Sequence, residues 1–252
     1  MAESLKVAAT AERGSEPAED TRARLPARAL LIALAGLVGG NVAAVVGYSV
    51  GLSVTPDERV TPLVLSEFLL WGGMLWACVV ASRRYGTGLV RADFAVRPRG
   101  TDAAWGLLFA VADWVAAGTV TWLVSRLGRS YAGSNDSIVT DVLDDPPALV
   151  ATILFAVVGA PIVEELFFRG LVQRALESWA GIGVAVVLQA LLFGAVHLAE
   201  IRGSGWLGLW LSLSAIGLVH GLVYQRFRRI TTCMWTHALF NVTGVLVIVS
   251  AA

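Results

Sequence analysis

The chain has 252 residues, of which 56% are hydrophobic and only 15% are charged, and its 19 basic and 19 acidic side chains leave no net charge. Soluble domains carry about a quarter charged residues, so this composition excludes a soluble enzyme and a disulfide-rich scaffold. The basic excess of nucleic-acid-binding proteins is also missing. These exclusions leave an integral membrane protein that has the lipid bilayer, and no nucleic acid, as a partner.

The N-terminal part of the chain differs from the rest in composition. Residues 1–28 are rich in Ala, Glu and Arg and contain no apolar run, which predicts a disordered cytoplasmic tail. The first apolar stretch begins near Ala29 and is too long for the apolar region of a cleavable signal peptide. Five glycines within this first span, 29–54, permit close contact between helices. They are Gly36, Gly39, Gly40, Gly47 and Gly51.

Further uncharged stretches follow along the chain. Their lengths of about 20 residues match the roughly 30 Å hydrocarbon core of a bilayer at 1.5 Å per helical residue. Pro146 and Pro147 stand where the fourth span begins, a position that favours proline. The later spans are predicted near 62–82, 103–123, from 148 onward, 182–198, 205–224 and 231–250. The pattern predicts an all-α integral membrane protein, a bundle of about seven transmembrane helices with the active site inside the bundle.

Arginine placement orients these spans. Arginines are concentrated in the tail, between spans two and three, and after span six, whereas the loop after span three is acidic. Cytoplasmic loops carry the excess of basic residues, so we expect a cytoplasmic N-terminus. The basic residues are almost all arginine, which is typical of a GC-rich bacterial genome. The chain is therefore predicted to be a multi-pass protein of the bacterial cell (plasma) membrane.

Ionisable groups inside membrane spans cost about 2.5–3.5 kcal/mol each on insertion scales, so each one requires a reason. Two adjacent carboxylates, Glu164 and Glu165, follow an uncharged run, and their side chains point about 100° apart on a helix. Glu165 shares a helix face with Arg169 in the order that favours an ion pair. Glu164 has no local counter-charge and is the candidate general base. The alternative is a helix end at the membrane interface, where water solvates both glutamates.

Two later spans supply imidazoles. Phe193 and His197 are four residues apart, so the phenyl ring packs against the imidazole. His237 and Asn241 have the same spacing and form a pair of donors suited to an oxyanion. Packing and hydrogen bonds between helices are the structural alternatives. Because the groups lie on successive apolar helices, we expect them to converge on one site. No Ser or Cys stands in a nucleophile motif, which favours attack by water on an amide carbonyl.

Three further ionisable groups lie in spans outside these motifs. His220 is flanked by Gly217 and Gly221, which indicates tight helix packing around it. Glu67 and Asp113 either pair across spans two and three or line a water-filled entrance. The sequence leaves both possibilities open.

The rise of a helix per residue determines how deep each histidine lies in the membrane. A span that starts near residue 182 places His197 about 23 Å into the membrane, whereas His237 lies about 12 Å beyond Arg229. Both reach Glu164 if span five tilts or starts outside the bilayer. They also reach it if 148–179 forms one long helix that carries Glu164 at mid-depth.

Three short motifs occur in order within 148–250. They are E-E-x-x-x-R, F-x-x-x-H and H-x-x-x-N, and together they resemble the CPBP family of intramembrane proteases. This family is named for CAAX processing and bacteriocin processing and is also called the ABI family. The chain before the motifs matches only as generic membrane spans. We therefore divide the chain into a tail (1–28), N-terminal transmembrane helices (29–145) and a CPBP-type catalytic core (146–252).

The resemblance implies a glutamate-dependent membrane endopeptidase, similar to type II CAAX prenyl proteases, that needs no cofactor. The implied catalytic residues are Glu164 and His197, which activate water, and His237 and Asn241, which hold the oxyanion. The implied supporting residues are Glu165, Arg169 and Phe193. The expected substrate is a membrane-associated peptide or membrane protein, and the oligomeric state is left open.

Two alternatives remain at the level of sequence. Glu164, His197 and His237 could supply the three protein ligands of an open zinc site, as in a metalloprotease. No H-E-x-x-H motif is present, and Asn241 suits an oxyanion better than a metal. The other alternative is a non-enzymatic membrane protein that confers bacteriocin immunity or binds a peptide.

Overall fold

The computed structural model describes residues 25–127, 139–200 and 205–251. Most of the tail predicted at 1–28 lies outside these residues. Within the described ranges the chain is helical and contains no strand. The all-α fold expected from the composition is therefore confirmed.

The helices fall into two groups, those outside and those inside the segment that carries the first two motifs. Outside it lie α2 (Ala29–Val54), α3 (Val60–Tyr85), the short α4 (Val90–Asp93), α5 (Asp102–Arg126), α10 (Trp206–Phe227) and α11 (Ile230–Ala251). Inside it, in chain order, lie α7 (Pro146–Leu154), π-helical η1 (Phe155–Gly159), α8 (Ala160–Glu165), π-helical η2 (Leu166–Gln173), α9 (Arg174–Val196) and the 3₁₀ turn η3 (His197–Glu200).

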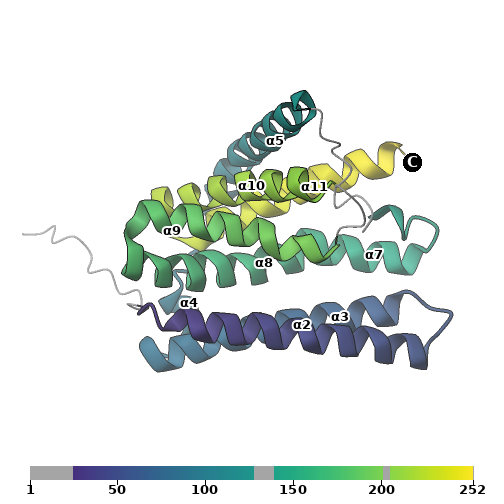
Figure 1. Cartoon of the computed structure of the whole chain (residues 1–252), viewed down its shortest axis with the longest axis horizontal. Coiled ribbons are helices and arrows are strands. Elements are labelled where there is room, and N and C mark those ends of the chain that lie inside the picture. The colour runs from purple at the N-terminus through teal and green to yellow at the C-terminus, as the bar shows by residue number, and fades with distance from the viewer. Residues whose placement is uncertain (1–24, 128–138, 201–204, 252) are drawn as a thin grey trace, which may run out of the picture.

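Six helical segments in the described part of the chain are long and apolar enough to cross a membrane. The longest, Pro146–Val196, reverses direction at Gly181, whose φ of 77° and ψ of 170° suit a residue without a Cβ. Figure 1 shows the two arms of this segment side by side. Counted as separate arms, they give the predicted number of about seven crossings. The first arm is continuous, and Glu164 lies near its middle. This agrees with the alternative in which 148–179 forms one long helix that carries Glu164 at mid-depth.

The arginine-rich connections gather at one end of the bundle, on the left in Figure 1. There the guanidinium of Arg28 lies 5.1 Å from the ring centre of Tyr85 at the end of α3. The hydroxyl of Thr231 in α11 donates a hydrogen bond to the carbonyl of Arg97 at 3.0 Å. Arg28, the α3–α5 connection and the α10–α11 connection thus share one end. That this end faces the cytoplasm stays a prediction from the arginine pattern.

The α3–α5 connection is fastened to the helix that carries the glutamates. Asp93 accepts hydrogen bonds from Ser82 and Thr87. Burial alone raises the pKa of the Asp93 carboxyl, but these hydrogen bonds outweigh it and hold the pKa below its ordinary value. Arg174 of α9 donates to the backbone carbonyl of Asp93. The buried ring of Phe94 lies where a side chain on Gly170 would extend. The loop therefore fixes the position of η2.

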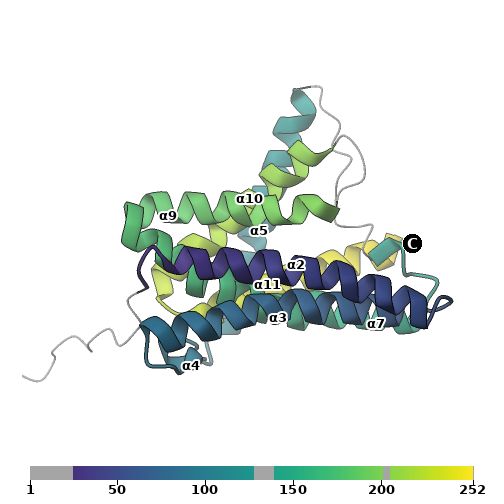
Figure 2. The ribbon, with the colours of Figure 1, turned by 60° about the horizontal axis from the view of Figure 1, so that its bottom comes forward.

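A seam of small residues joins α2 to α3, which lie side by side in Figures 1 and 2. A Cβ built on Gly36 would lie 2.5 Å from the carbonyl oxygen of Gly73, closer than real atoms approach. Gly40, Gly47 and Gly51 meet α3 in the same way. The predicted close contact is confirmed for these four glycines. It is wrong for Gly39, which has nothing within 4 Å because it lies on another face.

This seam gives a matched pair of substitutions. Gly36→Ala is expected to lower the free energy of unfolding by about 1–3 kcal/mol, because its methyl group forces α2 and α3 apart. Gly39→Ala is expected to leave stability unchanged or slightly raised, since alanine is the better helix former. Thermal unfolding in detergent, followed by circular dichroism, measures both. Equal midpoints for the two variants would contradict the close packing of α2 on α3.

Candidate active site

The two adjacent glutamates end α8, a short α-helix between two π-helical stretches. π-helical turns frequently occur at functional sites, because their i→i+5 bonds shift side chains and free backbone groups. Here the backbone carbonyl of Ala156 in η1 accepts a hydrogen bond from Nδ2 of Asn241 at 2.7 Å. The residue spacings in the sequence do not indicate these π-helical stretches. Their one local sign is Pro161, which has no N–H with which to continue ordinary helical bonding.

Glu165 is the centre of a buried polar cluster. Its Oε1 accepts hydrogen bonds from Nη1 of Arg169 at 3.1 Å, from Nδ1 of His220 at 2.9 Å and from Nδ1 of His237 at 3.0 Å. The side chains of Glu165, Arg169 and His220 are fully buried. The ion pair predicted between Glu165 and Arg169 is confirmed. The same carboxylate also joins α8 to α10 and α11.

His220 lies between two carboxylates. Its Nε2 is 2.9 Å from Oδ2 of Asp113 in α5, and its Nδ1 faces Glu165. An ionised carboxylate only accepts hydrogen bonds, so His220 satisfies both neighbours by donating from both ring nitrogens, as an imidazolium. The interpretation of His220 as a packing residue was incomplete. The possible pairing of Asp113 with Glu67 is wrong, because Asp113 bonds His220 and its other oxygen has no hydrogen-bond partner.

The cluster is balanced in charge. Two carboxylates, Asp113 and Glu165, face one guanidinium, Arg169, and one imidazolium, His220. Such pairing is what makes ions tolerable inside a low-dielectric interior. The Arg169 guanidinium also lies 4.6 Å from the ring centre of Phe193, in cation–π contact. The buried charges thus offset one another within a few ångströms.

The ring of Phe193 has a larger role than its motif suggests. Its centre lies 4.9 Å from that of His197, which confirms the predicted contact. It also lies 6.4 Å from the ring centre of His220 and 6.1 Å from that of His237. One aromatic side chain therefore packs against all three histidines and against Arg169.

Glu164 and His197 form a second pair beside this cluster. Oε2 of Glu164 lies 4.0 Å from Nε2 of His197, and each side chain is 15% exposed. Nδ1 of His197 donates to the carbonyl of Phe193 at 2.7 Å, so Nε2 is the nitrogen beside Glu164 and accepts when the ring is neutral. Oε2 of Glu164 has no hydrogen-bond partner. Two acceptors therefore face each other, an arrangement suited to a small donor such as water.

His237 and Asn241 each use one donor within the protein. Nδ1 of His237 donates a hydrogen bond to Glu165, and the amide of Asn241 donates one to the Ala156 carbonyl. Asn241 keeps a second amide proton to donate, and Nε2 of His237 accepts in the neutral ring and donates when the ring is protonated. The predicted pairing of these two residues at an oxyanion remains a prediction.

Among the described residues, the potential metal ligands that lie closest together are not the three predicted for zinc. The three groups there whose ligand atoms all lie within 4.8 Å of one another are Glu165, His220 and His237. The predicted ligands Glu164, His197 and His237 are not such a group among the described residues.

The group that does gather is a poor site for zinc. Oε1 of Glu165 already accepts from the guanidinium of Arg169. A bound dication and the guanidinium of Arg169 would bring three positive charges to the cluster. The carboxylates of Glu165 and Asp113 offset two of them, so with neutral imidazoles one buried positive charge would remain uncompensated. The same residues as hydrogen-bonded ions are neutral overall, which costs less in an apolar interior.

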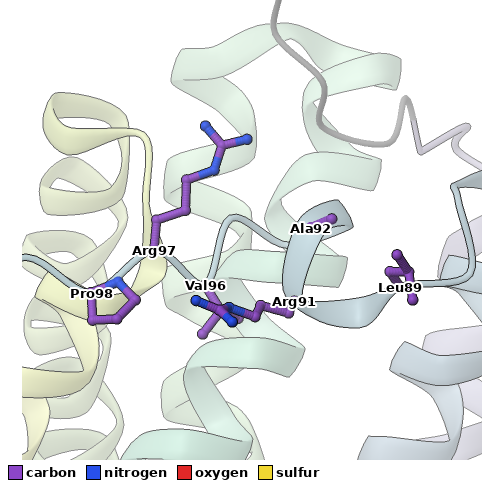
Figure 3. Close-up of a pocket in the computed structure, with 6 residues that line it drawn as sticks. All are labelled: Leu89, Arg91, Ala92, Val96, Arg97 and Pro98. Carbon is purple, nitrogen blue, oxygen red and sulfur yellow. The ribbon is translucent and has the colours of Figure 1, made fainter.

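A surface hollow lies elsewhere, in the α3–α5 connection (Figure 3). It is lined by Leu89, Arg91, Ala92, Val96, Arg97 and Pro98. None of the residues predicted for catalysis lines it. The polar cluster and the Glu164–His197 pair are therefore the candidate site.

Comparison with known families bears directly on these residues. Residues 146–243 match the family described as "Type II CAAX prenyl endopeptidase Rce1-like". The segment 146–243 is thus similar to the CPBP family that the three motifs resemble. It holds every predicted catalytic and supporting residue, whereas Asp113 lies before it and His220 lies inside it but outside the three motifs.

One curated relative also matches. It is "Putative membrane peptidase YdiL" of Bacillus subtilis (strain 168), which is 27% identical over 136 residues, or 54% of this chain. The chain spans about half, 51%, of that relative's length. No solved structure matches the chain. The six apolar helices of the described residues make the chain a multi-pass membrane protein, and its segment 146–243 is similar to a membrane-peptidase family.

The buried ion pair gives a prediction on stability. Arg169→Met is expected to lower the free energy of unfolding by about 3–5 kcal/mol, because Glu165 stays buried with less compensation. Arg59→Met is the control, since it breaks the exposed ion pair with Asp144 and is expected to change stability little. Thermal unfolding of both variants in detergent is the measurement. If Arg169→Met and the Arg59→Met control unfold at the same temperature, the conclusion that Glu165 is the centre of a stabilising ion cluster is refuted.

Proposed function

We propose that the protein is an intramembrane endopeptidase of the CAAX-protease type that hydrolyses membrane-associated peptides or proteins. The observation that carries this proposal is the facing pair of acceptors, Oε2 of Glu164 and Nε2 of His197, 4.0 Å apart. The match of 146–243 to a peptidase family supports the same function. In this proposal the N-terminus is cytoplasmic and the membrane is the bacterial plasma membrane.

The proposed reaction begins with a water molecule between Glu164 and His197. Two hydrogen bonds of about 2.8 Å span the separation between the two acceptor atoms. Glu164 takes a proton as the water oxygen attacks the carbonyl carbon of the peptide bond. The resulting tetrahedral intermediate carries its negative charge on the former carbonyl oxygen. Transfer of the proton to the amide nitrogen then breaks the C–N bond and releases a carboxylic acid and an amine.

His237 and Asn241 are proposed to stabilise the oxyanion. The hydrogen bond from Nδ1 of His237 to Glu165 directs the other ring nitrogen, Nε2, to the opposite side of the ring. Nε2 of His237 donates to the oxyanion when this nitrogen carries a proton. A donor of this kind contributes about 10²–10³ in kcat. Arg169 and Phe193 hold Glu165 and the three imidazoles in place.

The membrane context supports a substrate that lies in the bilayer. Glu164 stands near the middle of a helical arm that runs from Pro146 to the reversal at Gly181, and it is only 15% exposed. Large apolar side chains such as Val158 and Ile162 are exposed on the same arm, where lipid covers them. A peptide bond reaches Glu164 from within the membrane more readily than from bulk water.

A substitution of Glu164 tests this function. Glu164→Gln is expected to reduce cleavage of a quenched fluorescent peptide panel by about 10²–10⁴-fold, because the amide accepts no proton from water. Glu177→Gln is the control, since Glu177 lies on the same arm but bonds Gln173 and Gln225 instead. Initial rates of the purified proteins in detergent give the comparison. Equal cleavage by wild type and Glu164→Gln would overturn the assignment of Glu164.

A chelator separates this mechanism from the zinc alternative. The proposed mechanism predicts that wild-type cleavage is unchanged by a zinc chelator. Loss of cleavage with the chelator, followed by recovery on addition of zinc, would replace the metal-free mechanism with a metalloprotease. Thermal unfolding of each sample shows that the protein is folded in all arms of the experiment.

A further inference from the structure

We propose that Asp113 and His220 are positioning residues that hold Glu165 and, through it, the imidazole of His237. Neither residue belongs to the three motifs, and Asp113 lies on a helix before the segment that matches the family. The catalytic consequence rests on the proposed function, in which His237 faces the substrate. The placement of protons within the cluster does not depend on that function.

The four groups form one continuous line of hydrogen bonds across four helices. Oδ2 of Asp113 in α5 lies 2.9 Å from Nε2 of His220 in α10. Nδ1 of His220 lies 2.9 Å from Oε1 of Glu165 in α8. The same oxygen lies 3.0 Å from Nδ1 of His237 in α11. Carboxylates and imidazoles alternate, so every N–H in the line has an acceptor.

This alternation fixes where the protons are. With Asp113 as acceptor at Nε2, His220 is held in one ring orientation and donates from Nδ1 to Glu165. If Oε1 of Glu165 rotated away, one donor each of His220, Arg169 and His237 would lose its acceptor. Because Oε1 has a fixed position and only accepts, the proton of His237 that faces it stays on Nδ1. The orientation of the ring is then set, and Nε2 faces away from Glu165. Asp113 thus acts on His237 through two intervening groups.

A purely structural role does not account for Asp113. Helix α5 is already tied to the α10–α11 connection and the start of α11 by Asp102, which accepts from Arg229 at 2.7 Å and from Thr232 at 2.7 Å. Asp113 lies 11 residues, or about three turns, further along and so on nearly the same face. A buried carboxylate and imidazole cost more than an apolar pair of similar size. Their retention is explained if the charge itself acts on the cluster.

Several charged and titratable groups of the described residues lie beside this line. Arg169 donates to Glu165, His197 reaches the cluster through the ring of Phe193, and Glu164 pairs with His197. The thiol of Cys233 donates to the backbone carbonyl of His220 at 3.6 Å. His220 faces two carboxylates: Glu165 also pairs with Arg169, whereas Asp113 pairs with His220. Removal of Asp113 therefore changes the protonation of His220 first.

Nitrogen NMR reads these protons directly. The chain contains three histidines, His197, His220 and His237, so the full-length protein with ¹⁵N-histidine and a histidine-free tag gives three imidazole signal sets. The wild type is expected to show one imidazolium at neutral pH, assigned to His220 by its loss in His220→Gln. Asp113→Asn is expected to convert that signal to a singly protonated ring and to shift the His237 signals. Asp102→Asn, the control, is expected to leave both unchanged.

The NMR result decides the positioning claim without any activity. Unchanged His237 signals in Asp113→Asn would overturn it, as would a singly protonated His220 in the wild type. Where Asp113→Asn fails to fold, His220→Gln supplies the same test, because its amide replaces only one of the two donors. The His237 signals are then expected to shift in His220→Gln, and their constancy would overturn the proposal.

Kinetics test the catalytic consequence. Asp113→Asn and His220→Gln are each expected to lower kcat by about 10–100-fold, with KM unchanged and an altered pH profile, as for other groups that orient a reacting residue. The double variant is expected to lose no more than either single variant, because the two act as one unit. Asp102→Asn is expected to lower the melting temperature while kcat and its pH profile stay as in the wild type.

The outcomes separate the two proposals. If the wild type cleaves no peptide, the proposed function fails, while the NMR signals still decide the proton placement. If the wild type cleaves and Asp113→Asn has the wild-type kcat at every pH, the catalytic part of the inference is overturned. If Asp102→Asn changes kcat and the pH profile as Asp113→Asn does, the effect is general destabilisation and the inference also fails.

Discussion

The carboxylate of Glu165 is an ion inside an apolar bundle, and the fold must supply enough donors to hold it there. An unpaired carboxylate in such surroundings costs several kcal/mol, so its partners have to arrive from several helices at once. Arg169 comes from the next turn of the same arm, while His220 and His237 come from α10 and α11. Asp113 on α5 then offsets the positive charge that His220 carries. The arrangement of four helices follows from this requirement.

Backbone features elsewhere make that convergence possible. The reversal at Gly181 returns the chain along the arm that carries the glutamates, which brings Phe193 and His197 beside it. The π-helical stretches on both sides of α8 alter the angular spacing of side chains along the arm. One of them also offers the Ala156 carbonyl to Asn241. α2 and α3 pack on each other through the small-residue seam and also contact η2, whereas the hydrogen bonds of the polar cluster join α8 to α5, α10 and α11.

Much of this was predictable from local spacing. The first span was predicted at 29–54 and the structure has the same bounds, because an uncharged run of membrane length has clear ends. The contacts of Glu165 with Arg169 and of Phe193 with His197 follow from a spacing of four residues. The π-helical stretches and the bond between Asp113 and His220 were not predictable. That bond joins residues 107 positions apart, and no local pattern indicates which buried acid meets which imidazole.

The polar cluster also shows how the N-terminal helices and the family segment depend on each other. The motifs lie within 146–243, but two buried acids of α5, Asp102 and Asp113, bind Arg229 and His220 of that segment. Without Asp113, an imidazolium at His220 would add a positive charge beside Arg169 with only Glu165 to offset both. The charge state of the segment's central histidine is therefore set by a helix outside it. A helix that carries none of the motifs thereby contributes to the electrostatics of the site.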